Sequence, residues 1–258
     1  MHIVVCMKQV PQQNSVKINP DLSIDAGGIE QIMSLFDEYA VEEAISWNEQ
    51  LGGKVTVLSI GPEEWKDQMR RALAMGATDA LLVCDPAFDN LDAIGAARVA
   101  AAAITKLADV DLVICGRNST DDETGAFGPA LARALRWPQL TYVGKVNQLD
   151  GSRLVAERHL ESQIETVATR LPAVLTVVKG INEPRYPSLL RIRKVARAEV
   201  PTLTAADLGF GAAPITPAAQ VVGRVPPPPR PQSELIEGPD AAGKVRQLVE
   251  KLREAQVI

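Results

Sequence analysis

The sequence predicts a doubly wound α/β fold with a mostly parallel sheet, and two observations support this prediction. Four short segments are apolar almost throughout, as expected of strands buried on both faces: residues 2–7, 54–60, 79–85 and 111–116. Segments with the helical spacing of apolar residues separate them. Strands and helices that alternate in this way are joined by right-handed crossovers, so helices are expected on both faces of the sheet.

A predicted helix follows each of these strands. The connection between the first strand and its helix is longer than the others. Helical spacing of apolar residues covers residues 38–51, 63–75, 91–107 and 124–135. Asp37 is expected to cap the first helix, because Asp is a favoured N-cap residue. Gly52 and Gly76 are expected to end the first two helices.

After Pro138 the pattern changes to strands without helices between them. Strand-like segments cover residues 141–149, 153–160, 164–170 and 172–178. The letters "LDGS" at residues 149–152 are typical of a hairpin turn. We therefore expect an antiparallel extension of the sheet.

Two domains are predicted, an α/β domain at residues 1–200 and an arm at residues 201–258. Nine of the 18 prolines lie from Pro201 to Pro239, and the run "PPPP" at residues 226–229 favours an extended, polyproline-like tether. Asp240 then caps a last helix, whose apolar face consists of Val245, Leu248, Val249, Leu252 and Ala255. That face either folds back on its own domain or docks on another subunit.

Composition argues against several functions. A net charge of -5 and a pI near 5.2 disfavour general nucleic-acid binding. No apolar run reaches the ~18 residues of a membrane span, and no leader pattern follows Met1, so we expect a cytoplasmic protein without membrane insertion. Cys6, Cys84 and Cys115 lie in apolar segments without a Cys-x-x-Cys pair, which favours buried, reduced thiols over metal binding.

The most informative candidate site is "CGRNSTDDETGAFGPALARAL", residues 115–135. Ligands of open parallel sheets bind at the carboxyl ends of strands, and Gly116 ends such a strand. Gly125 and Gly128 accompany a predicted helix start, where backbone N–H groups favour a phosphate. The three acids at residues 121–123 oppose anion binding, so a capped turn and a cation site remain as alternatives.

Familiar catalytic patterns are absent from the sequence. It contains neither a G-x-x-x-x-G-K-[ST] phosphate loop nor a G-x-S-x-G elbow, and no G-x-G-x-x-G follows the first strand. The two histidines, His2 and His159, lie at the start and end of predicted strands, where structural or surface roles are expected. A nucleotide-binding module or a carrier fits better than an enzyme with its own acid–base groups.

Several stretches together resemble the beta subunit of electron transfer flavoproteins. They are "VVCMKQVP", "FDEYAVEEAI", "RALAMGATDALLV", "GRNSTDDETGAFGP", "RWPQLTYV", "LPAVLTV" and "INEPRYPSLLRIRK". The resemblance runs from the first strand to about Val200, and the proline-rich arm also suits the family. It implies a Rossmann-like sheet of the adenine nucleotide alpha hydrolase-like type. The letters "RHLESQIETVATRLPAV" depart from the family pattern, which usually has a glycine-containing acidic turn before "LPAVLTV".

The resemblance also implies cofactors and partners. Such a beta subunit forms a heterodimer with an alpha subunit, which holds most of the redox-active FAD. The beta subunit itself carries an adenine nucleotide, AMP in one branch and a second FAD in the branch that bifurcates electrons from NADH. Electrons come from acyl-CoA or other dehydrogenases and pass to a quinone-linked or ferredoxin-linked partner.

The loop resembles the bifurcating branch more closely than the AMP branch. Gly116, Arg117, Thr124 and Gly128 lie at matching places, whereas Phe127 stands where that branch has Val. FAD is therefore the favoured nucleotide of this chain, with AMP as the alternative. The resemblance assigns nucleotide contacts to Cys6, Lys8, Ser34, Phe36, Ile60, Gly116, Arg117, Asp121, Asp122, Thr124, Gly125, Ala126, Phe127 and Gly128. Plain core packing is the alternative for Cys6, Phe36 and Ile60.

A basic stretch, residues 181–197, resembles the segment by which partner dehydrogenases recognise the family. Between residues 184 and 198 it has four arginines and a lysine and no carboxylate. The resemblance assigns partner docking to Glu183, Pro184, Arg185, Tyr186 and Leu189, with Leu189 as the apolar anchor. Ser188 is expected to cap a helix over residues 189–198. An ordinary solvated surface helix is the alternative.

Two other functions compete with an electron carrier. One is a free-standing, stress-type module that binds an adenine nucleotide and has no redox role. The other is an ATP-consuming enzyme of a related fold, which would need a Ser/Gly phosphate loop after the first strand. The letters "MKQVPQQNS" do not supply such a loop.

Overall fold

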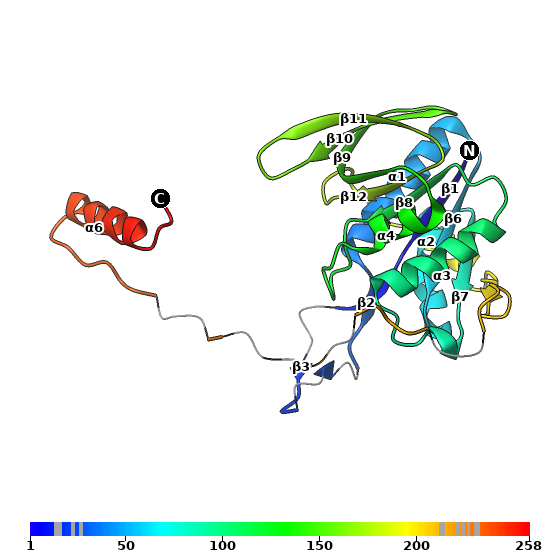
Figure 1. Ribbon diagram of the computed structural model, residues 1–258, viewed down its shortest axis with the longest axis horizontal. Coiled ribbons are helices and arrows are strands. Elements are labelled where there is room, and N and C mark those ends of the chain that lie inside the picture. Colours follow the sequence, from blue (N-terminus) through cyan, green and yellow to red (C-terminus); the bar gives the residue numbers. More distant parts are fainter. Residues whose placement is uncertain are drawn as a thin grey trace. The chain divides into compact units, whose positions relative to one another are not determined.

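The computed structural model describes residues 1–12, 17–21, 24–25, 28–211, 215–219, 222, 225, 228–229 and 233–258 (Figure 1). The chain forms two units, Met1–Val222 and Gly223–Ile258. Half of the predicted polyproline run, residues 226–227, lies outside the described residues. Within the described part of the chain, no helix is long and apolar enough to cross a membrane.

A nine-stranded sheet forms the centre of the first unit, in the order β11-β10-β9-β12-β8-β1-β6-β7-β13. The four strands expected from apolar runs are β1 (His2–Cys6), β6 (Lys54–Ile60), β7 (Asp79–Val83) and β8 (Leu112–Gly116). They pair in parallel, with Val4 opposite both Thr56 and Val113. The prediction of a doubly wound, mostly parallel sheet is confirmed.

Helices cover both faces of this sheet (Figure 1). The helices α1 (Leu35–Leu51) and α2 (Lys66–Met75) contribute to one core, and α3 (Ala93–Lys106) and α4 (Phe127–Leu135) to the other. Alternate residues of β1 enter the two cores, with Val5 in the first and Val4 in the second. Because both faces are buried, the strand sequences show no polar alternation.

Two predicted helix starts are wrong. The N-cap of α1 is Ser34, so Asp37 lies inside the first turn, where tertiary hydrogen bonds engage its carboxylate. The helix α4 begins at Phe127 instead of residue 124, because the polar residues before it form their own turn. A 3-10 helix, η2 (Glu63–Trp65), precedes α2, and a second, η3 (Pro86–Phe88), follows β7. The predicted C-caps at Gly52 and Gly76 are confirmed.

The expected antiparallel extension consists of β9 (Gln139–Leu149), β10 (Arg153–His159) and β11 (Ile164–Arg170). The next strand, β12 (Ala173–Val177), does not belong to it. It lies between β8 and β9 and runs parallel to both. Every residue of β12 is buried, as in β1 and β8. Its apolar run predicted a strand correctly but did not define its neighbours.

Short elements complete the first unit. The strands β2 (Gln9–Pro11) and β5 (Gln31–Met33) pair with each other, as do β3 (Lys17–Ile18) and β4 (Ile24–Asp25). The strand β13 (Thr202–Leu203) pairs with β7, so the sheet continues beyond residue 200. The helix α5 (Leu189–Val195) has the expected Ser188 cap but is shorter than predicted.

The second unit contains one helix, α6 (Ala241–Glu254), among its described residues. Asp240 caps it as predicted, because its carboxylate accepts a hydrogen bond from the backbone N–H of Gly243 at 2.7 Å. No residue of α6 is buried, and the apolar side chains of Val245 and Leu248 are exposed.

Candidate functional site

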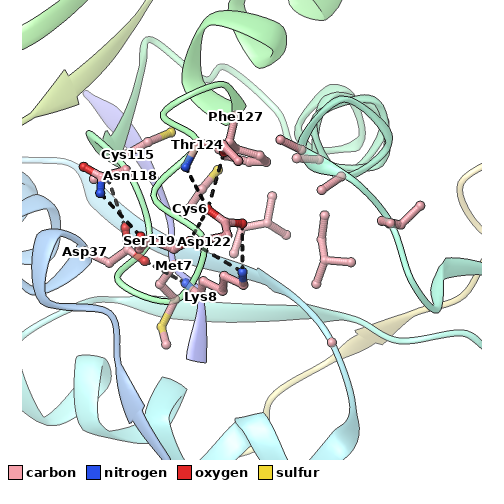
Figure 2. A pocket seen from close by; sticks show the side chains of 18 of the residues that line it. Cys6, Met7, Lys8, Asp37, Cys115, Asn118, Ser119, Asp122, Thr124 and Phe127 are labelled. Atoms are coloured by element: carbon pink, nitrogen blue, oxygen red, sulfur yellow. Dashed lines mark hydrogen bonds and ion pairs between the residues drawn. The ribbon is translucent and has the colours of Figure 1, made fainter. Parts of the chain in front are cut away.

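A cavity of about 320 Å³ lies at the carboxyl ends of β1, β6 and β8 (Figure 2). This is the edge where ligands of open parallel sheets bind. Residues predicted as nucleotide contacts that line the cavity are Cys6, Lys8, Ile60, Gly116, Arg117, Asp122, Thr124, Gly125 and Phe127. Those that do not line it are Ser34, Phe36, Asp121, Ala126 and Gly128.

The cavity lining has an apolar and a polar part. The apolar part includes Phe88, at a strand end, and residues that the sequence did not single out: Leu58, Trp65, Leu91, Ala96 and Ala100. The alanines of α3 at residues 93, 96 and 100 share one helical face, which is a signal that could have revealed them. The polar part consists of Lys8 and the loop from Arg117 to Gly125. Such a division suits a ligand with an apolar ring and a phosphate.

Asp37 joins two strand ends at the base of the polar part. Its carboxylate accepts hydrogen bonds from the backbone N–H groups of Lys8 at 2.8 Å and Gly116 at 3.1 Å. Burial raises the pKa of Asp37 to about 7, although these two N–H groups and the Lys8 charge act in the opposite direction. Gly116 must be small, since an added Cβ would lie 2.5 Å from the carboxylate.

Lys8 faces the acidic loop across the polar part (Figure 2). Its Nζ atom lies 2.7 Å from Asp121 and 3.3 Å from Asp122. Asp122 also accepts hydrogen bonds from the Ser119 hydroxyl at 2.9 Å and the Thr124 backbone N–H at 3.1 Å. The acids therefore organise a turn and partly neutralise Lys8. Among the described residues, no group of three or more His, Cys, Asp or Glu side chains is arranged to hold a metal ion.

The start of α4 lies beside this turn. Its N-cap is Ala126, and no side chain caps the helix within the described structure, so the first-turn N–H groups have no side-chain acceptor. Gly128 lets α4 approach β12, because an added Cβ would collide with the Cγ2 methyl of Thr176. Phe127 contributes its ring to the cavity lining. A small helix start beside a polar turn is a suitable place for a phosphate.

Two residues assigned to the nucleotide lie behind the cavity. The buried hydroxyl of Ser34 accepts a hydrogen bond from the Thr120 backbone N–H at 3.3 Å and so fixes the loop. The Arg117 guanidinium lies 5.1 Å from the centre of the Phe36 ring and 5.5 Å from that of the Tyr142 ring. Both contacts orient groups that line the cavity, and neither side chain lines it itself.

The cysteines are free thiols, as predicted, but Cys84 is only half-buried. Cys6 and Cys115 are opposite each other on β1 and β8, and both line the cavity. The hydrogen bond with Cys6 and burial raise the pKa of the Cys115 thiol well above its usual value. A thiol with a raised pKa is a poor nucleophile, which suits a packing role. The predicted structural role of His2 is also supported, since its buried ring bonds Thr56 and the Ala108 carbonyl.

The docking segment, defined here as residues 181–197, is not a uniformly free basic patch. Arg185 is bound to two carboxylates of α1, Glu42 and Glu49. The apolar side chains of Tyr186, Leu189 and Leu190 are 91%, 75% and 80% exposed. Sequence alone did not reveal the acidic partners, which lie well over a hundred residues away in the chain.

The family profile "Electron transfer flavoprotein domain" matches residues 21–208. The chain belongs to the electron transfer flavoprotein family. It is 39% identical to the electron transfer flavoprotein subunit beta of Thermoanaerobacterium thermosaccharolyticum over the whole of both chains. It is 33% identical to the caffeyl-CoA reductase-Etf complex subunit CarD of Acetobacterium woodii, again over both whole chains. Protein FixA of Azotobacter vinelandii is 32% identical over 95% of this chain and 91% of that protein.

These relatives confirm the resemblance to electron transfer flavoprotein beta subunits. They support a role in electron transport. The family name, electron transfer flavoprotein, also supports an association with flavin. The fold of this family member, with its cavity at the carboxyl ends of parallel strands, agrees with that role.

Proposed function

We propose that the chain is the beta subunit of a heterodimeric electron transfer flavoprotein and binds an adenine nucleotide in the cavity at the carboxyl ends of β1, β6 and β8. The observation that supports this most directly is the two-part lining. Apolar side chains such as Ile60 and Leu58 suit the adenine ring, and the Arg117–Gly125 loop with Lys8 suits the phosphates.

The favoured nucleotide is FAD, with AMP as the alternative. Both share the adenosine and phosphate parts, which the same residues would hold: Ile60 and Phe127 beside the base or sugar, and Lys8, Thr124 and the α4 start beside the phosphates. The loop resembles the FAD branch at Gly116, Arg117 and Thr124. When bound, FAD supplies a redox group that accepts a hydride from NADH and releases single electrons. In that case the chain takes part in electron bifurcation.

The proposed alpha partner accounts for the arm. In α6, Val245 is 57% and Leu248 44% exposed, so its apolar face needs a surface to cover it. We assign residues 1–200 to nucleotide binding and, within the predicted arm of residues 201–258, α6 to docking on the alpha subunit, whereas β13 of that arm pairs with β7. The heterodimer then holds the principal FAD mainly in the alpha subunit, with this chain beside it. A cytoplasmic location stays a prediction.

The docking segment is proposed to receive acyl-CoA or other dehydrogenases as electron donors. Leu189 is the apolar anchor, and the charged side chains around it form the rim of a small interface. Electrons leave to a quinone-linked or ferredoxin-linked acceptor. An exposed apolar centre with a charged rim suits a partner that must bind specifically and dissociate quickly.

A free-standing adenine-nucleotide module without a redox role is the alternative function, and co-expression with the alpha subunit separates the two. If the proposal is right, the two chains copurify as a yellow complex with an equal number of copies. A stable colourless homodimer that ignores the alpha subunit would support the alternative.

A further inference from the structure

The docking segment is attached to the body of the protein by a double ion pair at Arg185. The Nε atom of Arg185 donates to the Glu42 carboxylate at 2.9 Å, and its Nη2 atom donates to the same group at 2.9 Å. Its Nη1 atom donates to Glu49 at 2.6 Å. The backbone N–H of Arg185 also donates to Glu42 at 3.0 Å. A single guanidinium therefore joins two carboxylates that lie two turns apart on α1.

The two carboxylates differ in their surroundings. Glu42 is buried, with 7% of its side chain exposed, whereas 55% of the Glu49 side chain is exposed. A buried carboxylate needs a partner with several donors, because burial without one is unfavourable. The hydrogen bonds with Glu49 and Glu42 raise the pKa of Arg185 further above its ordinary value. The planar fork of Arg185 donates to the two carboxylates through separate N–H groups, a bidentate geometry that the single ammonium of Lys does not reproduce.

Two further contacts hold the segment on either side of Arg185. The Asn182 side chain donates to the Tyr39 carbonyl at 3.1 Å and to Glu43 at 2.9 Å. Beyond the exposed apolar side chains, Nη1 of Arg191 donates to the Met75 carbonyl at 2.9 Å, at the end of α2. The segment is thus anchored to α1 before the apolar group and to α2 after it.

Tyr186, Leu189 and Leu190 lie between these anchors and are largely exposed. We propose that Arg185 is a positioning residue: by joining Glu42 and Glu49 it holds Tyr186 and Leu189 in the partner-binding arrangement before any partner binds. This inference rests on the proposed docking function of the segment. A preformed segment avoids the ordering of mobile side chains on binding, which would otherwise weaken the interface.

Arg185→Lys tests the inference, because it keeps the charge and removes the fork. In the free chain we expect amide hydrogen exchange at Arg191 and Ile192, whose backbone N–H groups are hydrogen-bonded to Ser188, to become about tenfold faster, with the other helices unchanged. For the heterodimer we measure electron transfer from an acyl-CoA dehydrogenase that its acyl-CoA substrate keeps reduced. We expect the KM for the heterodimer to rise about fivefold at unchanged kcat. Glu49→Gln removes only the charge of the exposed partner and leaves Glu42 paired. It should raise the exchange rate and the KM about twofold.

Arg98→Lys is the matched control, since Arg98 is an exposed arginine on α3, outside the docking segment. It should leave exchange and KM unchanged. Unchanged exchange in Arg185→Lys, or faster exchange without a rise in KM, would overturn the positioning role. Leu189→Ala separates this result from a failure of the proposed function. If Leu189→Ala does not raise KM, the docking assignment itself is wrong and the positioning role falls with it.

Discussion

The carboxylate of Asp37 accepts a hydrogen bond from the backbone N–H of Gly116 at 3.1 Å and thereby ties the start of α1 to the end of β8. The other carboxylate oxygen accepts from Lys8 at the end of β1. One buried side chain thus fixes two of the three strand ends that surround the cavity. The polar part of the candidate nucleotide site depends on this arrangement.

Asp37 should make stability depend on pH. The pKa of Asp37 is about 7 in the folded chain against an ordinary value of 3.8, so the folded state holds an extra proton between these values. The contribution of this group to stability is complete below about pH 4 and is lost as pH rises through 7, by up to about 4 kcal/mol. Urea unfolding from pH 4 to 8 measures the loss.

Asp37→Asn is the comparison for this experiment. The variant keeps one acceptor oxygen but cannot ionise, so the difference in unfolding free energy between wild type and variant should decrease as pH rises. A difference that stays constant or increases over the same range would show that Asp37 titrates with an ordinary pKa.

Gly128→Ala should destabilise the protein. The added Cβ collides with the Thr176 methyl, whose rotamer is held because its hydroxyl accepts a hydrogen bond from the Tyr142 backbone N–H at 3.2 Å. We expect a loss of about 1–3 kcal/mol in urea unfolding. Gly151→Ala is the control, since nothing lies within 4 Å of its added Cβ. Equal stability of the two variants would contradict the close packing of α4 on β12.

Lys8→Gln should weaken nucleotide binding more than it changes stability. Its ion pairs with Asp121 and Asp122 are partly exposed, so their loss costs less than about 1 kcal/mol. The lost charge-assisted bond to a phosphate should lower affinity about 10- to 100-fold. Titration of AMP and of FAD into the nucleotide-depleted heterodimer measures this. Lys145→Gln is the control, because Lys145 does not line the cavity. Equal nucleotide affinity of the two variants would show that Lys8 does not bind the phosphate.

Leu189→Ala should leave the fold intact and slow electron transfer from the donor. The side chain is 75% exposed, so its truncation should change the unfolding free energy by less than about 0.5 kcal/mol. Loss of an apolar anchor should reduce kcat/KM for the donor dehydrogenase about tenfold or more. Ile164→Ala, at a 63% exposed residue of β11, is the control. Unchanged donor kinetics in Leu189→Ala would assign docking to another surface.

The sequence predicted the strands and helices of the fold better than it predicted which strands pair with each other. Apolar runs identified β1, β6, β7 and β8, because strands buried on both faces have a distinctive composition. The same signal in β12 could not say which strands it pairs with, since every central strand looks alike. Spacing predicted the last turns of α1 and α2, where Gly52 and Gly76 supply local caps.

Side-chain partners that are distant in the chain escaped prediction. Asp37 has the composition of an N-cap, but its contacts are Lys8 and Gly116. Arg185 belongs to a local basic stretch, but its acidic partners lie on α1. The strand ends and the 116–128 loop were predictable because the topology of a parallel sheet brings them together. The apolar lining from Leu91 and α3 was not, because such residues resemble ordinary core.

The adenine-nucleotide content of the purified alpha–beta complex tests the central claim most directly. Denatured complex is separated by chromatography, and FAD and AMP are counted per heterodimer. We expect one adenine nucleotide besides the principal FAD, as a second FAD or, in the alternative, as AMP. One FAD with no further adenine nucleotide would contradict nucleotide binding by this chain.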